Sequence, residues 1–137
     1  MRVALDTNVL AYAEGVNGPS MKNLALELVD SLPQSSVVLP VQTLGELFQV
    51  LVRKAGRSRA GARSAILSWR EAFSLFETSA ATMLAAADLA VTHQLGIWDA
   101  VILCAAAEAD CSGWRAVGGR NRCGESYLLT IDRRIGR

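Results

Sequence analysis

The sequence has 137 residues, of which 51% are hydrophobic and 20% are charged, a balance that predicts one compact domain with a continuous apolar core. The net charge of +1 argues against a uniformly basic nucleic-acid-binding protein. Three cysteines without a C-x-x-C pair argue against both a disulfide framework and a cysteine zinc site.

The first apolar run of the chain is too short for a signal peptide, because it begins at Val3 and stops at Asp6. No later apolar run reaches the length of a membrane span. We therefore expect a cytoplasmic protein without a membrane partner.

Apolar runs and amphipathic segments alternate along the chain. In chain order, the pattern predicts a strand at 2–5, a helix at 24–32, a strand at 37–39, helices at 44–52 and 58–73, a strand at 74–78, helices at 82–95 and 97–109, and a strand at 127–130. Gly96 is the expected C-cap of the helix at 82–95. Strands that alternate with helices predict an α/β sandwich with a mainly parallel sheet.

Residues 111–126 do not fit this alternation. They contain four Gly, three Arg and two Cys without periodicity of either kind, so the sequence predicts no structure for them. They also begin the basic end of the chain, since residues 111–137 hold six Arg against two acids. Residues 1–110 hold eight Lys and Arg against eleven acids.

Four acidic residues stand at positions from which they can converge. Asp6 and Asp132 follow predicted strands, and the carboxyl ends of parallel strands meet at one edge of a sheet. Glu46 and Asp99 lie early in predicted helices that start from the same edge. Crowded carboxylates need a neutralising cation, and a cluster without His or Cys favours Mg²⁺ or Mn²⁺. Such an ion activates water and offsets phosphate charge, so phosphodiester hydrolysis is the natural chemistry.

Each acid also has an ordinary structural explanation. Asp6 could cap a following helix, and Glu46 could be a solvated helix residue. Asp99 could be an acid favoured by the helix dipole, and Asp132 could belong to a turn. Position by itself leaves these alternatives open.

Three segments together resemble a known family: VALDTNVL at 3–10, GEL at 45–47 and IWDAVILCAAA at 97–107. Their combination is similar to that of PIN-domain proteins, specifically the VapC-like toxins of bacterial type II toxin–antitoxin systems, from residue 1 to about residue 109. The resemblance implies a PIN-like three-layer α/β/α sandwich with a mainly parallel central sheet. It also implies RNA cleavage with Mg²⁺ or Mn²⁺, a cognate antitoxin that blocks the site, and commonly a homodimer.

The resemblance further implies roles for single residues. Asp6 and Asp99 correspond to the principal metal ligands of the family. Glu46 corresponds to the acid that completes the site or positions the attacking water. Thr7 and Asn8 are neighbours that could hold Asp6 by hydrogen bonds.

The tail departs from the family pattern. Residues 130–132 (TID) resemble the late Thr-x-Asp segment of the family, which makes Asp132 a fourth catalytic and metal-binding candidate. Family members pass from the Asp99-type helix through a short turn into the last strand, whereas here residues 111–126 intervene. We therefore expect a single PIN-like domain over residues 1–137, in which 111–126 are an atypical Gly/Arg-rich insertion or an altered tail.

The expected function is that of a toxin endoribonuclease, which directs water at an RNA phosphodiester with a metal ion held by Asp6, Glu46, Asp99 and Asp132. One alternative is a catalytically decayed PIN-like module that binds an antitoxin or a second copy of the chain. Another is a phosphatase with Asp6 as a covalent nucleophile. Phosphatases of the haloacid dehalogenase type usually carry a second Asp two residues later, where this chain has Asn8.

Two features outside the acids have a more ordinary interpretation. A basic cluster could hold RNA phosphates, but a solvated face that complements a helix dipole is the favoured interpretation. The cluster comprises Arg53, Lys54, Arg57, Arg59 and Arg63. Trp98 is expected to pack in the core and to fix the position of Asp99, rather than to stack on bases.

Overall fold

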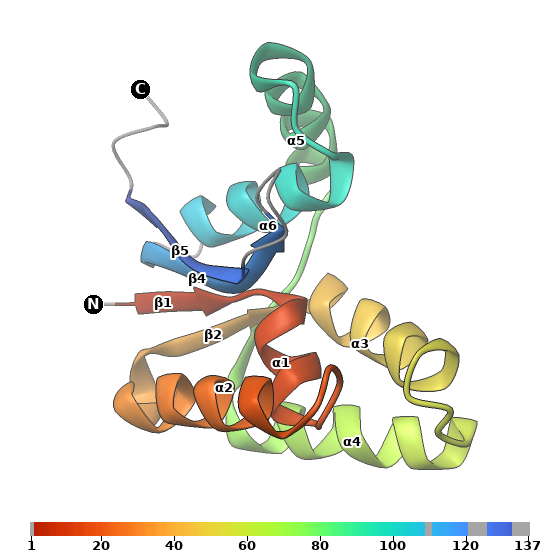
Figure 1. Cartoon of the computed structure of the whole chain (residues 1–137). Coiled ribbons are helices and arrows are strands. Elements are labelled where there is room, and N and C mark those ends of the chain that lie inside the picture. The colour runs from red at the N-terminus through yellow and green to blue at the C-terminus, as the bar shows by residue number, and fades with distance from the viewer. Residues whose placement is uncertain (1, 109–110, 121–125, 133–137) are drawn as a thin grey trace.

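The computed structural model describes residues 2–108, 111–120 and 126–132, and side chains for residues 3–105, 107 and 108. Its elements in chain order are β1 (Arg2–Leu5), α1 (Thr7–Ala13), α2 (Pro19–Ser31), the short 3₁₀ helix η1 (Gln34–Ser36), β2 (Val37–Pro40), α3 (Val41–Arg53), α4 (Arg59–Ala72), β3 (Ser74–Phe76), α5 (Ala80–His93), α6 (Ile97–Glu108), β4 (Cys111–Arg120) and β5 (Ser126–Asp132). One sheet lies between two layers of helices (Figure 1). Helices α1 to α4 lie on one side, and α5 and α6 lie on the other.

The sheet has the strand order β3-β2-β1-β4-β5. Strand β1 is parallel to both β2 and β4, and β2 is parallel to β3. Strand β5 alone among the described strands runs antiparallel, beside β4. The predicted three-layer α/β/α sandwich with a mainly parallel sheet is therefore confirmed.

The core forms where β1 and β2 are covered on both faces. Every residue of β2 is buried, as the short apolar run predicts for an inner parallel strand. Helix α3 packs Leu47 and Leu51 against this core, and both side chains are fully buried. This packing holds α3 against the sheet.

Local signals explain where several helices begin. The hydroxyl of Ser58 accepts a hydrogen bond from the Gly61 N–H at 3.0 Å, and Ser79 accepts one from the Thr82 N–H at 3.1 Å. These bonds satisfy backbone donors that the first turns of α4 and α5 leave free. The start of α2 instead has Pro19 in its first turn, where a missing N–H costs nothing.

The end of α5 corrects one expectation. Gln94, not Gly96, is the C-cap, and it adopts the left-handed conformation with φ of 52°. The helix ends at His93, three residues before the glycine, so Gly96 instead precedes α6. Its carbonyl accepts a hydrogen bond from the Ala100 N–H at 3.0 Å.

Part of the segment without a predicted structure forms a strand. Residues Cys111–Arg120 make up β4, which continues the sheet beyond β1. Local periodicity gave no signal for this strand because its pairing partners on both sides stabilise it. Residues 121–125 lie outside the described part of the chain.

Glu14 joins α1 to the α3–α4 hairpin. Its carboxylate accepts hydrogen bonds from Arg57 Nη1 and from Trp69 Nε1, each at 2.8 Å. Its backbone carbonyl accepts a third bond, from Arg57 Nη2 at 2.7 Å. These bonds tie the end of α1 to the α3–α4 loop and to α4, and we call them together the Glu14 clamp.

Among the described helices, none combines the length and the hydrophobicity that a membrane span requires.

Candidate active site

Three helices begin at the same edge of the sheet. Helices α1 and α3 follow directly after β1 and β2, so both start at the carboxyl end of a parallel strand. Helix α6 ends shortly before β4 begins, and Cys111 at the start of β4 pairs with Arg2 at the start of β1. The beginning of α6 therefore lies at the opposite edge, where α1 and α3 start (Figure 1).

This topology positions the three acids that the sequence singled out. Asp6 precedes α1, Glu46 lies in the second turn of α3, and Asp99 lies in the first turn of α6. The negative charges of Asp99 and Glu46 both act on the Asp6 carboxyl. The predicted convergence of these three residues is thus present in the fold.

Asp6 is a buried acid, with 7% of its surface exposed. Burial raises the pKa of Asp6 to about 6, from an ordinary value of 3.8. The charges of Asp99 and Glu46 raise it as well, while the backbone N–H groups of Thr7 and Asn8 oppose the shift. Thr7 and Asn8 are the first two residues of α1, so the Asp6 carboxylate also interacts with the start of this helix, as an acid at an N-cap does.

The side chain of Thr7 contacts a second acid of the site. Its hydroxyl donates to Glu46 Oε2 at 2.6 Å, which links the start of α1 to α3. The other oxygen, Glu46 Oε1, is buried and has no hydrogen-bond partner among the described residues. The sequence predicted that Thr7 would hold Asp6 by a hydrogen bond, and the Thr7 backbone N–H does so. The contact of the Thr7 hydroxyl with Glu46 was not predicted, because contact across helices is not visible in the sequence.

Asp99 lies at the exposed rim of the site, in contrast to Asp6. A side chain at Gly96 would place its Cβ 3.6 Å from Asp99 Oδ2, which is ordinary van der Waals contact. The neighbouring Trp98 is 55% exposed. The expectation that Trp98 packs in the core is therefore wrong, because the buried face of α6 is formed by Ala100, Val101 and Ala105.

The sheet register separates Asp132 from this edge. Strand β5 is antiparallel, and its last residue Asp132 pairs with Gly113, which pairs in turn with Val3. The backbone of Asp132 thus lies level with Val3, toward the edge where β1 begins, whereas Asp6 follows the other end of β1. The sequence placed Asp132 at the same edge as Asp6 because it assumed that the last strand is parallel. Strand β5 is antiparallel, so this expectation is corrected.

The three acids do not form a closed ligand cage as their side chains lie. Among the described residues, no group of three His, Cys, Asp or Glu side chains is gathered closely enough to hold a metal ion. Their chemistry still fits a hard cation, because they offer oxygen atoms, including the unpartnered Glu46 Oε1. Mg²⁺ in particular is commonly bound by one or two carboxylates and retains several waters.

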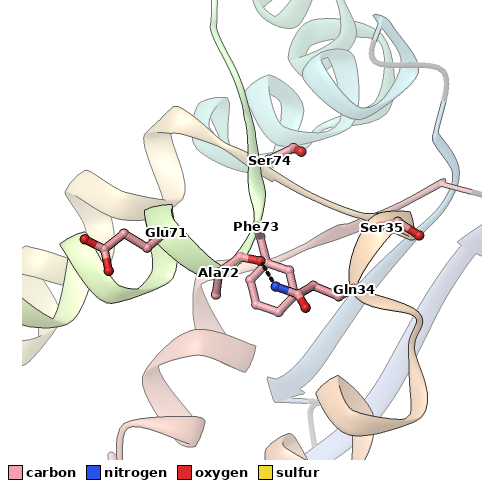
Figure 2. Close-up of a pocket in the computed structure, with 6 residues that line it drawn as sticks. All are labelled: Gln34, Ser35, Glu71, Ala72, Phe73 and Ser74. Atoms are coloured by element: carbon pink, nitrogen blue, oxygen red, sulfur yellow. Dashed lines mark hydrogen bonds between the residues drawn. The ribbon is translucent and has the colours of Figure 1, made fainter.

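A separate depression lies at the other edge of the sheet. It is lined by Gln34, Ser35, Glu71, Ala72, Phe73 and Ser74 (Figure 2). Gln34 Nε2 donates to the Ala72 carbonyl at 2.6 Å across it. None of the three acids lines this depression, which lies where β2 and β3 begin.

Comparison with known proteins agrees with the fold and extends over the tail. The PIN domain family model matches residues 3–137, and the chain belongs to this family. No curated protein sequence matches the chain.

Solved structures share the fold at low sequence identity. VapC20 from Mycobacterium tuberculosis, a sarcin-ricin loop cleaving toxin, has a TM-score of 0.73 and 20% identity, covering 85% of this chain and 90% of that one. A toxin–antitoxin complex from Klebsiella pneumoniae has a TM-score of 0.62 and 20% identity, with 89% and 88% covered. FitAcB from Neisseria gonorrhoeae has a TM-score of 0.56 and 19% identity, with 80% and 83% covered.

Proposed function

We propose that this protein is a metal-dependent ribonuclease whose site is formed by Asp6, Glu46 and Asp99. The observation that carries the proposal is the buried Asp6, held beside two other acids with its pKa raised to about 6. Such an arrangement is costly for a folded protein unless a cation offsets the charge. Sites with strongly perturbed acids are characteristic of catalysis.

Mg²⁺ or Mn²⁺ is the cation that these residues fit. Asp6 and Asp99 would supply carboxylate oxygens, and Glu46 would supply its unpartnered Oε1, either directly or through a water molecule. A divalent ion bound here would lower the pKa of a water molecule and offset negative charge on the phosphate.

The protein's own contribution is to hold the acids in place. The hydroxyl of Thr7 orients Glu46 by donating to Oε2, which leaves Oε1 as the free acceptor. Burial keeps Asp6 in a region of low dielectric, where its interaction with a cation or a proton is stronger than in water. The exposed Asp99 lies where a substrate can approach the site.

RNA, an antitoxin and a second copy of the chain are the proposed partners, in the cytoplasm. VapC20 is a sarcin-ricin loop cleaving toxin, which supports the RNA substrate by analogy, and the Klebsiella pneumoniae structure is a toxin–antitoxin complex, which supports the antitoxin by analogy. Asp132 is left out of the proposed site because its backbone lies toward the other edge of the sheet.

Cleavage of RNA by variants of the site tests the proposal. We expect Asp6→Asn and Asp99→Asn each to lower the rate of Mn²⁺-dependent cleavage by at least about a hundredfold, since each removes a charge that would hold the ion. Calorimetric titration with Mn²⁺ should show weaker binding in both variants. Asp30→Asn, on the exposed surface of α2, is the control that loses one carboxylate outside the site.

Two results would contradict the proposal. If Asp6→Asn or Asp99→Asn cleaved RNA as fast as the native protein, the acids would not form the active site. If the native protein bound no Mn²⁺ in calorimetry, the alternative of a PIN-like binding module without catalysis would be favoured.

A further inference from the structure

The charges of the chain are strongly segregated along its sequence. Between Glu46 and Glu71 there are six Lys and Arg residues and no acid. Residues 71–108, which include α5 and α6, contain acids but neither Lys nor Arg. The Lys and Arg residues of the first 110 residues are therefore concentrated in the α3–α4 hairpin, while the rest of this segment is mainly acidic.

Four cations at the tip of this hairpin are exposed and lack an acidic partner within the described residues. Arg57 differs from them, because Glu14 neutralises it in the clamp at 2.8 Å. We call the remaining four the cationic corner, and it consists of Arg53, Lys54, Arg59 and Arg63. The corner lies where α3 ends and α4 begins (Figure 1).

The helix dipole explains only half of the cationic corner. Arg53 and Lys54 lie at the C-terminal end of α3, where the dipole favours positive charge. Arg59 and Arg63 lie in the first two turns of α4, at the end where the dipole disfavours positive charge. No acid of the first turn offsets this cost. A solvated surface that merely complements the helices would not concentrate cations there.

The corner is joined to the acidic site by a single helix. Glu46 and Arg53 are seven residues apart on α3, which places them on the same face and about 10.5 Å apart along the helix axis. An elongated anion at the acids could therefore continue along α3 toward the corner. Single-stranded nucleic acids are bound in this way, by cations that follow the phosphate backbone.

We propose that the cationic corner binds the phosphate backbone of RNA beside the scissile position. The proposal rests on the proposed function, since it takes RNA as the ligand of the acidic site. The corner gives no base specificity, because contacts from Lys and Arg to phosphate groups do not depend on the nucleotide sequence. It raises affinity and fixes the direction in which the strand leaves the site.

Salt-dependent binding of a fluorescein-labelled single-stranded RNA tests the proposal. Anisotropy is measured in EDTA, so that binding is observed without metal-dependent cleavage. We expect Arg59→Gln/Arg63→Gln to bind more weakly, and the slope of log affinity against log salt to decrease by about 0.7 for each phosphate that is no longer neutralised, or about 1.4 for the two arginines together. Arg59→Lys/Arg63→Lys keeps both charges and should retain most of the slope, which also shows that the fold tolerates changes here.

The matched control is Lys22→Gln/Arg70→Gln, which removes the same charge from exposed positions outside the corner. Arg70 lies about 16 Å along α4 from Arg59, near the other end of the helix. The control should bind RNA like the native protein. An equal decrease of the slope in both Gln variants would overturn the proposal, because the effect would then follow from net charge.

Unchanged RNA binding by Arg59→Gln/Arg63→Gln would also overturn the proposal. If this variant in addition lost a dimer in light scattering, the corner would instead bind the acidic α5–α6 segment of a second copy. Failure of this proposal can be told apart from failure of the proposed function. If the native protein bound RNA in EDTA but did not cleave it with Mn²⁺, the ribonuclease function would be contradicted, whereas RNA binding by the corner would not.

Discussion

Thr7 shows how one hydroxyl can organise an acidic site. Its bond of 2.6 Å to Glu46 Oε2 crosses from α1 to α3 and is partly buried. A hydrogen bond to a charged acceptor contributes about 1.5–3 kcal/mol. Without it, both oxygens of Glu46 would lack a protein donor among the described residues.

We therefore expect Thr7→Val to reduce kcat/KM for RNA cleavage by about tenfold or more, while Thr7→Ser stays close to the native value. Valine keeps the volume of the side chain and removes the donor, whereas serine keeps the donor. Steady-state kinetics measure the effect, and Mn²⁺ titration shows whether it acts through the ion. Equal cleavage by Thr7→Val would mean that Glu46 needs no orientation by this hydroxyl.

The Glu14 clamp acts at the scale of whole elements, because it ties the end of α1 to the α3–α4 loop and to α4. Both charged partners are partly buried, with 33% of the Arg57 side chain and 21% of the Glu14 side chain exposed. Solvent therefore screens this pair less than a surface ion pair. Trp69 adds a donor to the clamp and stacks on Phe73 at a centroid distance of 5.9 Å.

We expect Arg57→Ala to lower the free energy of unfolding by about 1–3 kcal/mol, because it removes two hydrogen bonds and leaves part-buried acceptors unpaired. Arg57→Lys should restore only part of this stability, since one ammonium cannot reproduce the two-pronged contact. Urea denaturation measures both values. Arg59→Ala, at an exposed neighbouring position, is the control and should change stability by less than about 0.5 kcal/mol. If Arg57→Ala also changed the free energy of unfolding by less than about 0.5 kcal/mol, the Glu14 clamp would not stabilise the fold.

At the scale of the whole molecule, the Asp6 carboxyl couples folding to pH. Its pKa is about 6 in the folded protein and near 3.8 in the unfolded chain. Between these values the folded protein holds the proton and the unfolded chain does not, so stability falls as the pH rises through this window. The decrease is complete above about pH 6 and is on the order of 3 kcal/mol.

In EDTA, we expect the native protein to become less stable than Asp6→Asn as the pH is raised from about 4 to 7, because the variant carries no buried charge. Mn²⁺ should reverse the difference by offsetting the charge of Asp6 in the native protein. Chemical denaturation at several pH values, with and without Mn²⁺, measures the effect. Parallel pH profiles of the two proteins in EDTA would show that Asp6 is not desolvated in solution.

The sequence by itself determined the architecture and the main members of the site. Apolar runs and helical spacing predicted an α/β sandwich with a mainly parallel sheet, because the spacing of apolar residues indicates both the type of element and its buried face. The acids Asp6, Glu46 and Asp99 stood out because each follows a segment that ends or starts at one edge of such a sheet. Their catalytic role stays a prediction that the proposed variants test.

Tertiary structure alone decided which groups are neighbours. The pairing of Thr7 with Glu46, the exposure of Trp98 and the edge occupied by Asp132 depend on contacts between elements far apart in the sequence. A hydrophobic pattern gives the period of a strand but not its direction, so the antiparallel β5 could not be anticipated. The acidic site was therefore predictable as a set of residues, whereas its geometry followed from how three helices start at one edge of the sheet.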